Sequence, residues 1–433
     1  MGRFRRNVLS HAGATAVGSI AQLALILALS HWLTVAAFAS FLTAVAVVGI
    51  GEMASDFGVR VWAIRQFALA KPVQRILAPT LLVKVGYSLL LVTIVMVLPL
   101  SLLDEKQVLL AALIAGTQPS TDPLLWFLRG KERLDVEAAV VLTWRIGNVI
   151  LLAGLALMGF GVTALLLGWL VTNLVRGLTT WGLPWLAPLR QYSSWTMAGM
   201  MREAWSVTRL AFPIGTAFMA MAVYHRLGVL MLGELSQPQV VAWYGAAFTL
   251  VASVGFVATS ISVSSFPALS RAAEVGAWNE ASKIVYRKLH WVMLVFLPGC
   301  IMGIFLSTYV IGLLYPPSYA PAATAMVALL PGLYISTINL ALKFVLNVLH
   351  LNWADVISVV FGIVFFAVVL LSATPKDVLR LVGFSWSLGE LAIFMVKWSF
   401  LRRDGRITGL SLGQHVLVFI VLMLGLLLWG LKL

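Results

Sequence analysis

The stretch FPALSRAAEVGAWNEASKIVYRKL (residues 266–289) separates long apolar segments with an amphipathic, basic linker. A second linker of this kind, DFGVRVWAIRQFALAKPVQRIL, occupies residues 56–77. Each linker follows two apolar segments and precedes four more, and the two linkers begin roughly 210 residues apart. This arrangement indicates an internal repeat, with one copy in 11–184 and the other in 209–398. Because each copy holds an even number of segments, both copies begin on the same side of a membrane and are parallel.

The composition excludes a soluble protein. Of the 433 residues, 61% are hydrophobic and only 11% are charged, and the mean hydropathy is +0.98. About a quarter of a soluble globular chain is charged, so this chain cannot cover its surface with polar groups. The apolar segments extend along the whole length. The sequence therefore predicts an all-α polytopic membrane protein with no soluble domain.

About 20 apolar residues span the hydrocarbon core of a bilayer. That length predicts thirteen membrane helices, and the first is expected to remain uncleaved because no small-residue cleavage site follows it. They lie at 11–33, 35–55, 77–100, 107–128, 138–158, 161–184, 209–232, 240–264, 290–314, 322–347, 352–373, 377–398 and 411–431. Both basic linkers are expected to form helices on the cytoplasmic face.

The distribution of positive charge predicts the orientation. With the N-terminus in the cytoplasm, 23 of the 30 Lys and Arg fall in cytoplasmic loops or helix ends, as the positive-inside rule requires. The net charge of +14 is therefore a topology signal rather than a sign of nucleic-acid binding.

The repeat also predicts the domain organisation. We expect an N-lobe at 1–186, a cytoplasmic linker at 187–208, a C-lobe at 209–400 and an additional C-terminal helix within 401–433. Two parallel six-helix lobes around a central cationic cavity are an arrangement used for alternating access.

Several motifs resemble the polysaccharide-exporter branch of the multidrug/oligosaccharidyl-lipid/polysaccharide (MOP) superfamily, which contains the Wzx-type flippases. The C-terminal motifs are FPALSR, then ASKIVYRKLHWVMLVFLPGCIMGIF, then VIGLLYPPSYAPAATAMVALLPG. LGELSQPQVVAWYGAAFTLV is similar to a further segment of that branch, and MASDFGVRVWAIRQFA is similar to its motif after the second helix. One departure is YHRLG in the seventh helix, where the branch often has an acidic residue.

The resemblance implies two six-helix lobes in a V shape in a bacterial cytoplasmic (inner) membrane. It implies translocation of an undecaprenyl-diphosphate-linked oligosaccharide, a repeat unit of O-antigen, capsule or exopolysaccharide, from the inner to the outer leaflet. The partners would be that glycan lipid and membrane lipids, with a polysaccharide polymerase and a chain-length regulator. No nucleic acid and no cofactor are expected, apart from H⁺ or Na⁺ as a coupling ion.

Three arginines inside predicted membrane helices are the candidates for the diphosphate: Arg145, Arg226 and Arg176. A charge at mid-membrane costs roughly 2.5 to 3.5 kcal/mol on insertion scales, so an arginine there needs a reason to be retained. The planar guanidinium can make two parallel hydrogen bonds to a phosphate. The competing interpretation is a structural ion pair, such as Arg145 with Asp122 or Arg176 with Glu52.

Other polar residues are candidates for lining the same cavity. His11, Thr15, Ser19 and Gln22 fall on one face of the first helix, and Asn148 follows Arg145 by three residues. Glu52, Asp56, Asp122 and Glu390 are the intramembrane acids. Each acid is either a coupling-ion site or half of a salt bridge.

Two other functions were weighed. A multidrug/cation antiporter of the related branch would share the fold, but its pocket should hold acids and aromatic residues with few arginines. A polysaccharide polymerase or ligase needs a large outside loop with catalytic residues, and the predicted outside loops are short. No GxxxxGK[ST] motif is present, the histidines have no metal-ligand spacing, and Cys300 is the single cysteine.

Overall fold

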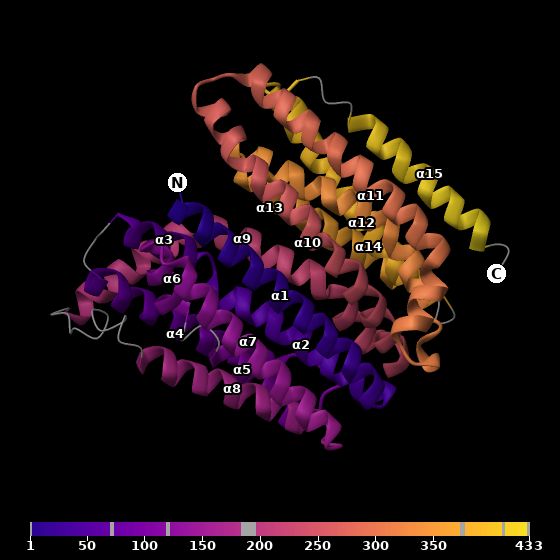
Figure 1. Ribbon diagram of the computed structural model, residues 1–433, viewed down its shortest axis with the longest axis horizontal. Helices are drawn as coiled ribbons and strands as arrows, with labels where there is room; N and C mark the ends of the chain where they lie inside the picture. Colours follow the sequence, from indigo (N-terminus) through magenta and orange to yellow (C-terminus); the bar gives the residue numbers. More distant parts are fainter. Residues whose placement is uncertain are drawn as a thin grey trace. The chain divides into compact units, whose positions relative to one another are not determined.

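A computed structural model describes residues 2–69, 73–117, 122–182, 196–372, 377–408 and 412–430. The described elements are helical, and their order follows the predicted segments (Figure 1). Nine helices among them are long and apolar enough to cross a membrane, and two shorter apolar stretches lie at Ala16–Trp32 and Gly413–Met423. The prediction of an all-α polytopic membrane protein is confirmed.

The chain divides into two compact units, Met1–Arg226 and Leu227–Leu433. Unit 1 contains α1 to α8 and most of α9. These helices are α1 (Gly2–Trp32), α2 (Val35–Asp56), α3 (Val59–Ala68), α4 (Val73–Val97), α5 (Glu105–Thr117), α6 (Asp122–Gly130), α7 (Leu134–Leu157), α8 (Val162–Gly182) and α9 (Met197–Leu235). Within it, α1 packs on α7, α5 packs on α2, α4 and α8, and α3 packs on α6.

Unit 2 is built around α12. Its elements are α10 (Pro238–Glu274), α11 (Trp278–Leu314), the short 3-10 helix η3 (Pro317–Tyr319), α12 (Ala322–Val348), α13 (Asn352–Leu371), α14 (Val378–Asp404) and α15 (Leu412–Gly430). The central helix α12 packs against α10, α11, α14 and α15, and α13 packs on α14. A buried hydrogen bond of 2.7 Å joins Tyr334 of α12 to His415 Nδ1 of α15, so the additional C-terminal helix docks on this unit.

The two basic linkers form different structures. The first contains a separate helix, α3, as expected. The second does not, because α10 continues to Glu274 and α11 already begins at Trp278, so most of the stretch extends these two helices. A short turn with Gly276 at φ +69° joins them. The predicted helix at 107–128 falls on α5, described to Thr117, and on α6, described from Asp122, and residues 118–121 between them lie outside the described residues.

The turn after α2 explains the Asp-Phe-Gly sequence at its end. Phe57 and Gly58 have positive φ of 32° and 78°, which ends α2 and starts α3 in a new direction. A Cβ on Gly58 would lie 2.7 Å from the Ala211 carbonyl oxygen and 2.8 Å from the Gly215 nitrogen of α9. Glycine is therefore required here both for its backbone conformation and for the close approach of α9. This contact fixes α9 against α2 and α3 in unit 1.

Candidate functional site

Arg145 lies at the centre of α7. It is 11 residues from Leu134 and 12 from Leu157, the ends of the helix, which places it about 17 Å from either end. That depth corresponds to the middle of a hydrocarbon core about 30 Å thick. The side chain is exposed in the protein and makes no ion pair within the described part of the chain.

The side chain of Arg145 lies against α1 at Gly18. A Cβ on Gly18 would lie 2.5 Å from Arg145 Cδ and 2.8 Å from Nη1. Any other residue at position 18 would therefore displace the guanidinium. Asn148 stands one turn further along α7, and its buried Oδ1 has no hydrogen-bond partner within the described residues. Arg145 thus offers five donors, and Asn148 offers an acceptor beside them.

The other residues of the predicted stripe on α1 are only partly described. Ser19 is exposed and Gln22 is half-buried. His11 and Thr15 belong to α1, but their side chains lie outside the described residues. Gly18 shares a helical face with Gln22, so the surface of α1 that meets Arg145 includes part of this stripe.

Arg226 ends unit 1 and contacts a second glycine. A Cβ on Gly49 of α2 would lie 3.2 Å from Arg226 Nε and 3.3 Å from Nη2. Glu52, one turn after Gly49, interacts electrostatically with Arg226. Arg176, the third candidate, lies half-buried in α8. Two of the three predicted arginines therefore lie against a glycine of an N-terminal helix.

The predicted acids are engaged by protein groups. Asp56 is buried and lies 3.5 Å from Arg60 Nε and 4.0 Å from Lys84 Nζ, and Lys84 itself covers the ring of Trp126 at 4.2 Å. Glu390 is buried in α14 and accepts a hydrogen bond of 2.7 Å from Asn339 Nδ2. Asp122 begins α6, and its side chain lies outside the described residues.

Unit 2 contains a buried ion cluster that was not predicted from the sequence. Lys397 of α14 is completely buried, lies 2.7 Å from Asp355 of α13 and donates to the carbonyl oxygen of Asn339 at 3.2 Å. Lys343 of α12 approaches the same carboxylate at 3.9 Å. Both lysines belong to the 23 cations that the positive-inside rule assigns to cytoplasmic loops or helix ends. Helical spacing cannot show that α12, α13 and α14 bring them to one acid, so only the packed structure reveals the cluster.

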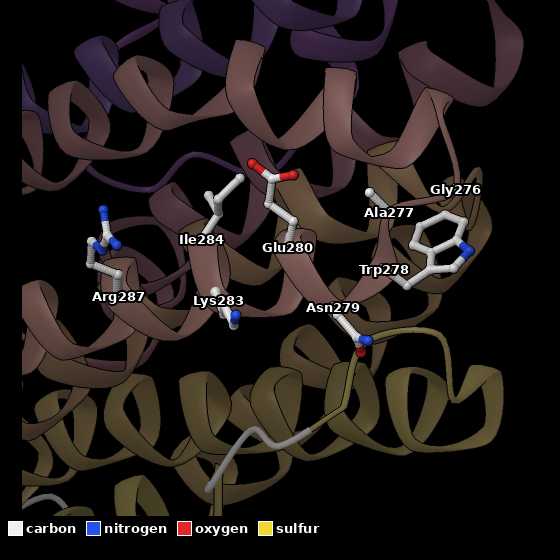
Figure 2. Close-up of a pocket in the computed structure, with 8 residues that line it drawn as sticks. All are labelled: Gly276, Ala277, Trp278, Asn279, Glu280, Lys283, Ile284 and Arg287. Carbon is white, nitrogen blue, oxygen red and sulfur yellow. The ribbon is translucent and has the colours of Figure 1, made fainter.

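A pocket of about 850 Å³ lies at the turn between α10 and α11 in unit 2 (Figure 2). It is lined by Gly276, Ala277, Trp278, Asn279, Glu280, Lys283, Ile284 and Arg287. Figure 2 shows Lys283 and Asn279 on one side of α11 and Glu280 and Ile284 on the other, so the pocket follows the helix face between them. This pocket was not predicted, and the basic character of the linker is the one feature of the sequence that pointed to it.

Comparison with known proteins decides the family. A family model described as "Polysaccharide biosynthesis protein" matches residues 4–273. The chain belongs to this family. No curated protein sequence matches the chain significantly.

Solved structures of MOP transporters share its fold. Lipid II flippase MurJ in an inward closed conformation matches with a TM-score of 0.72 at 11% identity, over 98% of this chain and 92% of that one. An inward-facing multidrug resistance MATE family transporter of the MOP superfamily matches with a TM-score of 0.62 at 14% identity, over 90% and 95%. The eukaryotic MATE transporter AtDTX14 gives 0.59 at 17%, over 97% and 99%. The predicted fold, which these transporters share, is confirmed.

Proposed function

We propose that the protein is a flippase that moves a polyprenyl-diphosphate-linked oligosaccharide from the inner to the outer leaflet of a bacterial cytoplasmic membrane by alternating access. A repeat unit of O-antigen, capsule or exopolysaccharide is the expected cargo. Membership of the polysaccharide biosynthesis family and the likeness in fold to a lipid II flippase both support this class of substrate. A polymerase and a chain-length regulator would then act on the product outside.

The observation that carries the proposal is the position of Arg145. It is a permanent cation at the midpoint of an apolar helix, and among the described residues no carboxylate pairs with it. An unpaired charge at this depth is costly, so a structural role gives no reason to retain it. An anionic group that crosses the membrane gives that reason.

The chemistry of this site suits a diphosphate. The guanidinium of Arg145 can bind two phosphate oxygens in parallel, and it remains charged throughout the transport cycle. In a conformation that exposes it, the Oδ1 of Asn148, which has no hydrogen-bond partner among the described residues, can accept a hydrogen bond from a sugar hydroxyl next to the diphosphate. Arg176 and Arg226, also in membrane helices of unit 1, are proposed as further cations along the path.

The acids argue against the multidrug/cation antiporter. An organic cation needs an acid that is available to it at mid-membrane. Asp56 has Arg60 and Lys84 close by, Asp355 has two lysines, and Glu52 interacts with Arg226. Those acids already have cationic neighbours within the protein, whereas Arg145 has no acidic one within the described residues. This imbalance favours an anionic substrate.

The test is a translocation assay with purified protein in liposomes. A polyprenyl-diphosphate oligosaccharide with a fluorescent sugar is placed in both leaflets. A membrane-impermeant quencher reaches only the outer leaflet, so the loss of the remaining fluorescence measures how fast the inner-leaflet glycolipid moves outward. Ethidium efflux from matched liposomes tests the alternative. We expect glycolipid movement that is lost in Arg145→Ala and no ethidium efflux. Efflux of ethidium without glycolipid movement would establish the antiporter instead.

A further inference from the structure

The pocket at the turn between α10 and α11 carries more positive charge than its own surroundings neutralise. Lys283 and Arg287 line it and are exposed, and within the described part of the chain neither forms an ion pair. Glu280 is the one acid of the lining. The lining therefore has a net positive charge, and its cations are available to a ligand.

A buried lysine adds to this charge. Lys288 follows Ile284 of the lining by one helical turn and is only 5% exposed. Its Nζ has no hydrogen-bond partner among the described residues and lies 4.9 Å from the centre of the Phe344 ring. Burial of an ammonium group without a partner is unfavourable. A negative charge in the adjacent pocket would offset part of that cost.

The backbone favours an anion at the same place. α11 begins at Trp278, and the residue before it, Ala277, provides no side-chain cap. The N–H groups of Trp278 and Glu280 donate to the carbonyl oxygens of Gly276 and Ala277, so they are already engaged within the turn. What the start of this 37-residue helix contributes to the pocket is the positive end of its dipole, which stabilises anions nearby.

The surroundings indicate a lipid rather than a soluble anion. Beyond Arg287, the same face of α11 continues with exposed apolar residues at helical spacing: Trp291, Leu294, Met302, Phe305 and Tyr309. An acyl chain can lie along this face while its headgroup occupies the pocket. Trp278, at the pocket end, is a residue type that prefers the membrane–water interface.

We propose that this pocket binds the phosphate of an anionic membrane phospholipid, with Lys283 and Arg287 as its direct partners and Lys288 as the cation behind them. Anionic lipids attract a basic residue near the membrane surface by about 1 kcal/mol each. This site is independent of the proposed transport site in unit 1.

The experiment is native mass spectrometry of the detergent-purified full-length protein, titrated with phosphatidylglycerol or phosphatidylcholine. Wild type should retain phosphatidylglycerol in preference to phosphatidylcholine. The double variant Lys283→Gln with Arg287→Gln should bind phosphatidylglycerol about 30-fold more weakly. The matched control Arg402→Gln with Arg403→Gln removes two exposed cations of unit 2 that do not line the pocket and should bind like wild type.

Lys288→Met separates binding from folding. Because it removes an unpartnered buried ammonium, the lipid-free variant should unfold at the same or a higher temperature than wild type, while its gain in unfolding temperature on adding phosphatidylglycerol shrinks. Equal retention of both lipids by wild type, or unchanged phosphatidylglycerol binding in the double variant, would overturn the proposal. Retention of undecaprenyl phosphate with no retention of phosphatidylglycerol would also overturn it and assign the pocket to the transported lipid.

Discussion

In unit 1, Arg145 of α7 lies against a glycine, and no acid is paired with it among the described residues. In unit 2, by contrast, Lys397 of α14 is completely buried and forms an ion pair with Asp355 at 2.7 Å. Both are cations within helices long and apolar enough to cross a membrane. The lysine has a carboxylate and a backbone carbonyl, so it joins three helices of unit 2 together. Among the described residues, the arginine has neither. We therefore propose that partners, rather than depth, separate a structural charge such as Lys397 from one that binds a ligand.

The largest expected effect comes from breaking the cluster of unit 2. Lys397→Met removes the nearest cation of Asp355 and leaves Lys343, at 3.9 Å, as its remaining ion-pair partner among the described residues. Loss of one member of a buried pair costs about 3 to 5 kcal/mol, so folded protein should be strongly depleted. Thermal unfolding in detergent, together with membrane abundance, measures this change. Adding Asp355→Asn should restore part of the loss, and Lys131→Met, at an exposed position, should leave both readings unchanged.

The next effect changes transport rather than stability. Gly18→Ala places a Cβ where Arg145 Cδ and Nη1 now lie, so the flexible guanidinium must move. Alanine is otherwise the better helix residue by up to about 1 kcal/mol, and the fold should persist. We expect glycolipid translocation to fall several-fold. Gly13→Ala on the same helix meets no atom within 4 Å and should translocate normally. Equal rates in the two variants would show that the position of Arg145 is unimportant.

The smallest effect concerns the docking of α15. Tyr334→Phe removes the hydroxyl that lies 2.7 Å from His415 Nδ1 and leaves a buried ring nitrogen without this partner. The expected cost is about 1 to 3 kcal/mol of stability, with translocation per folded molecule unchanged. Thermal unfolding and the liposome assay report the two quantities. A translocation defect at normal stability would give α15 a direct part in transport.

The sequence predicted the helices well and their charged contacts poorly. Apolar length, positive charge and the repeat are local or summed properties, so they located the membrane segments and indicated the MOP fold. They could not predict that Lys343, Asp355 and Lys397 meet, because three separate helices bring them together. The prediction of a surface helix in linker 266–289 was wrong for a related reason. Its amphipathic pattern fits a separate helix on the membrane surface, but it fits the ends of two long helices equally well. In the packed structure the stretch forms the ends of α10 and α11.

The arginine of the candidate site was predicted from its residue type, and the glycine that it contacts was found only in the structure. The single arginine in VVLTWRIGNVILL made position 145 a candidate, because the free-energy cost of a charge inside an apolar membrane helix can be inferred from the sequence. The requirement for Gly18 was not visible, because it arises where α1 meets α7. Gly49 and Arg226 repeat the same relation between α2 and α9. The assignment of these residues to substrate binding stays a prediction until transport is measured.

The most direct measurement compares Arg145→Ala with Arg145→Lys in membrane abundance and in glycolipid translocation. If the guanidinium binds the diphosphate, the alanine variant should reach normal abundance, because no carboxylate is left unpaired, and its translocation should be lost. The lysine variant keeps the charge without the two-pronged contact, so its translocation should fall only in part. Depleted abundance of Arg145→Ala, restored when Asp122→Ala is added, would show that the arginine is half of a structural pair and would contradict the account.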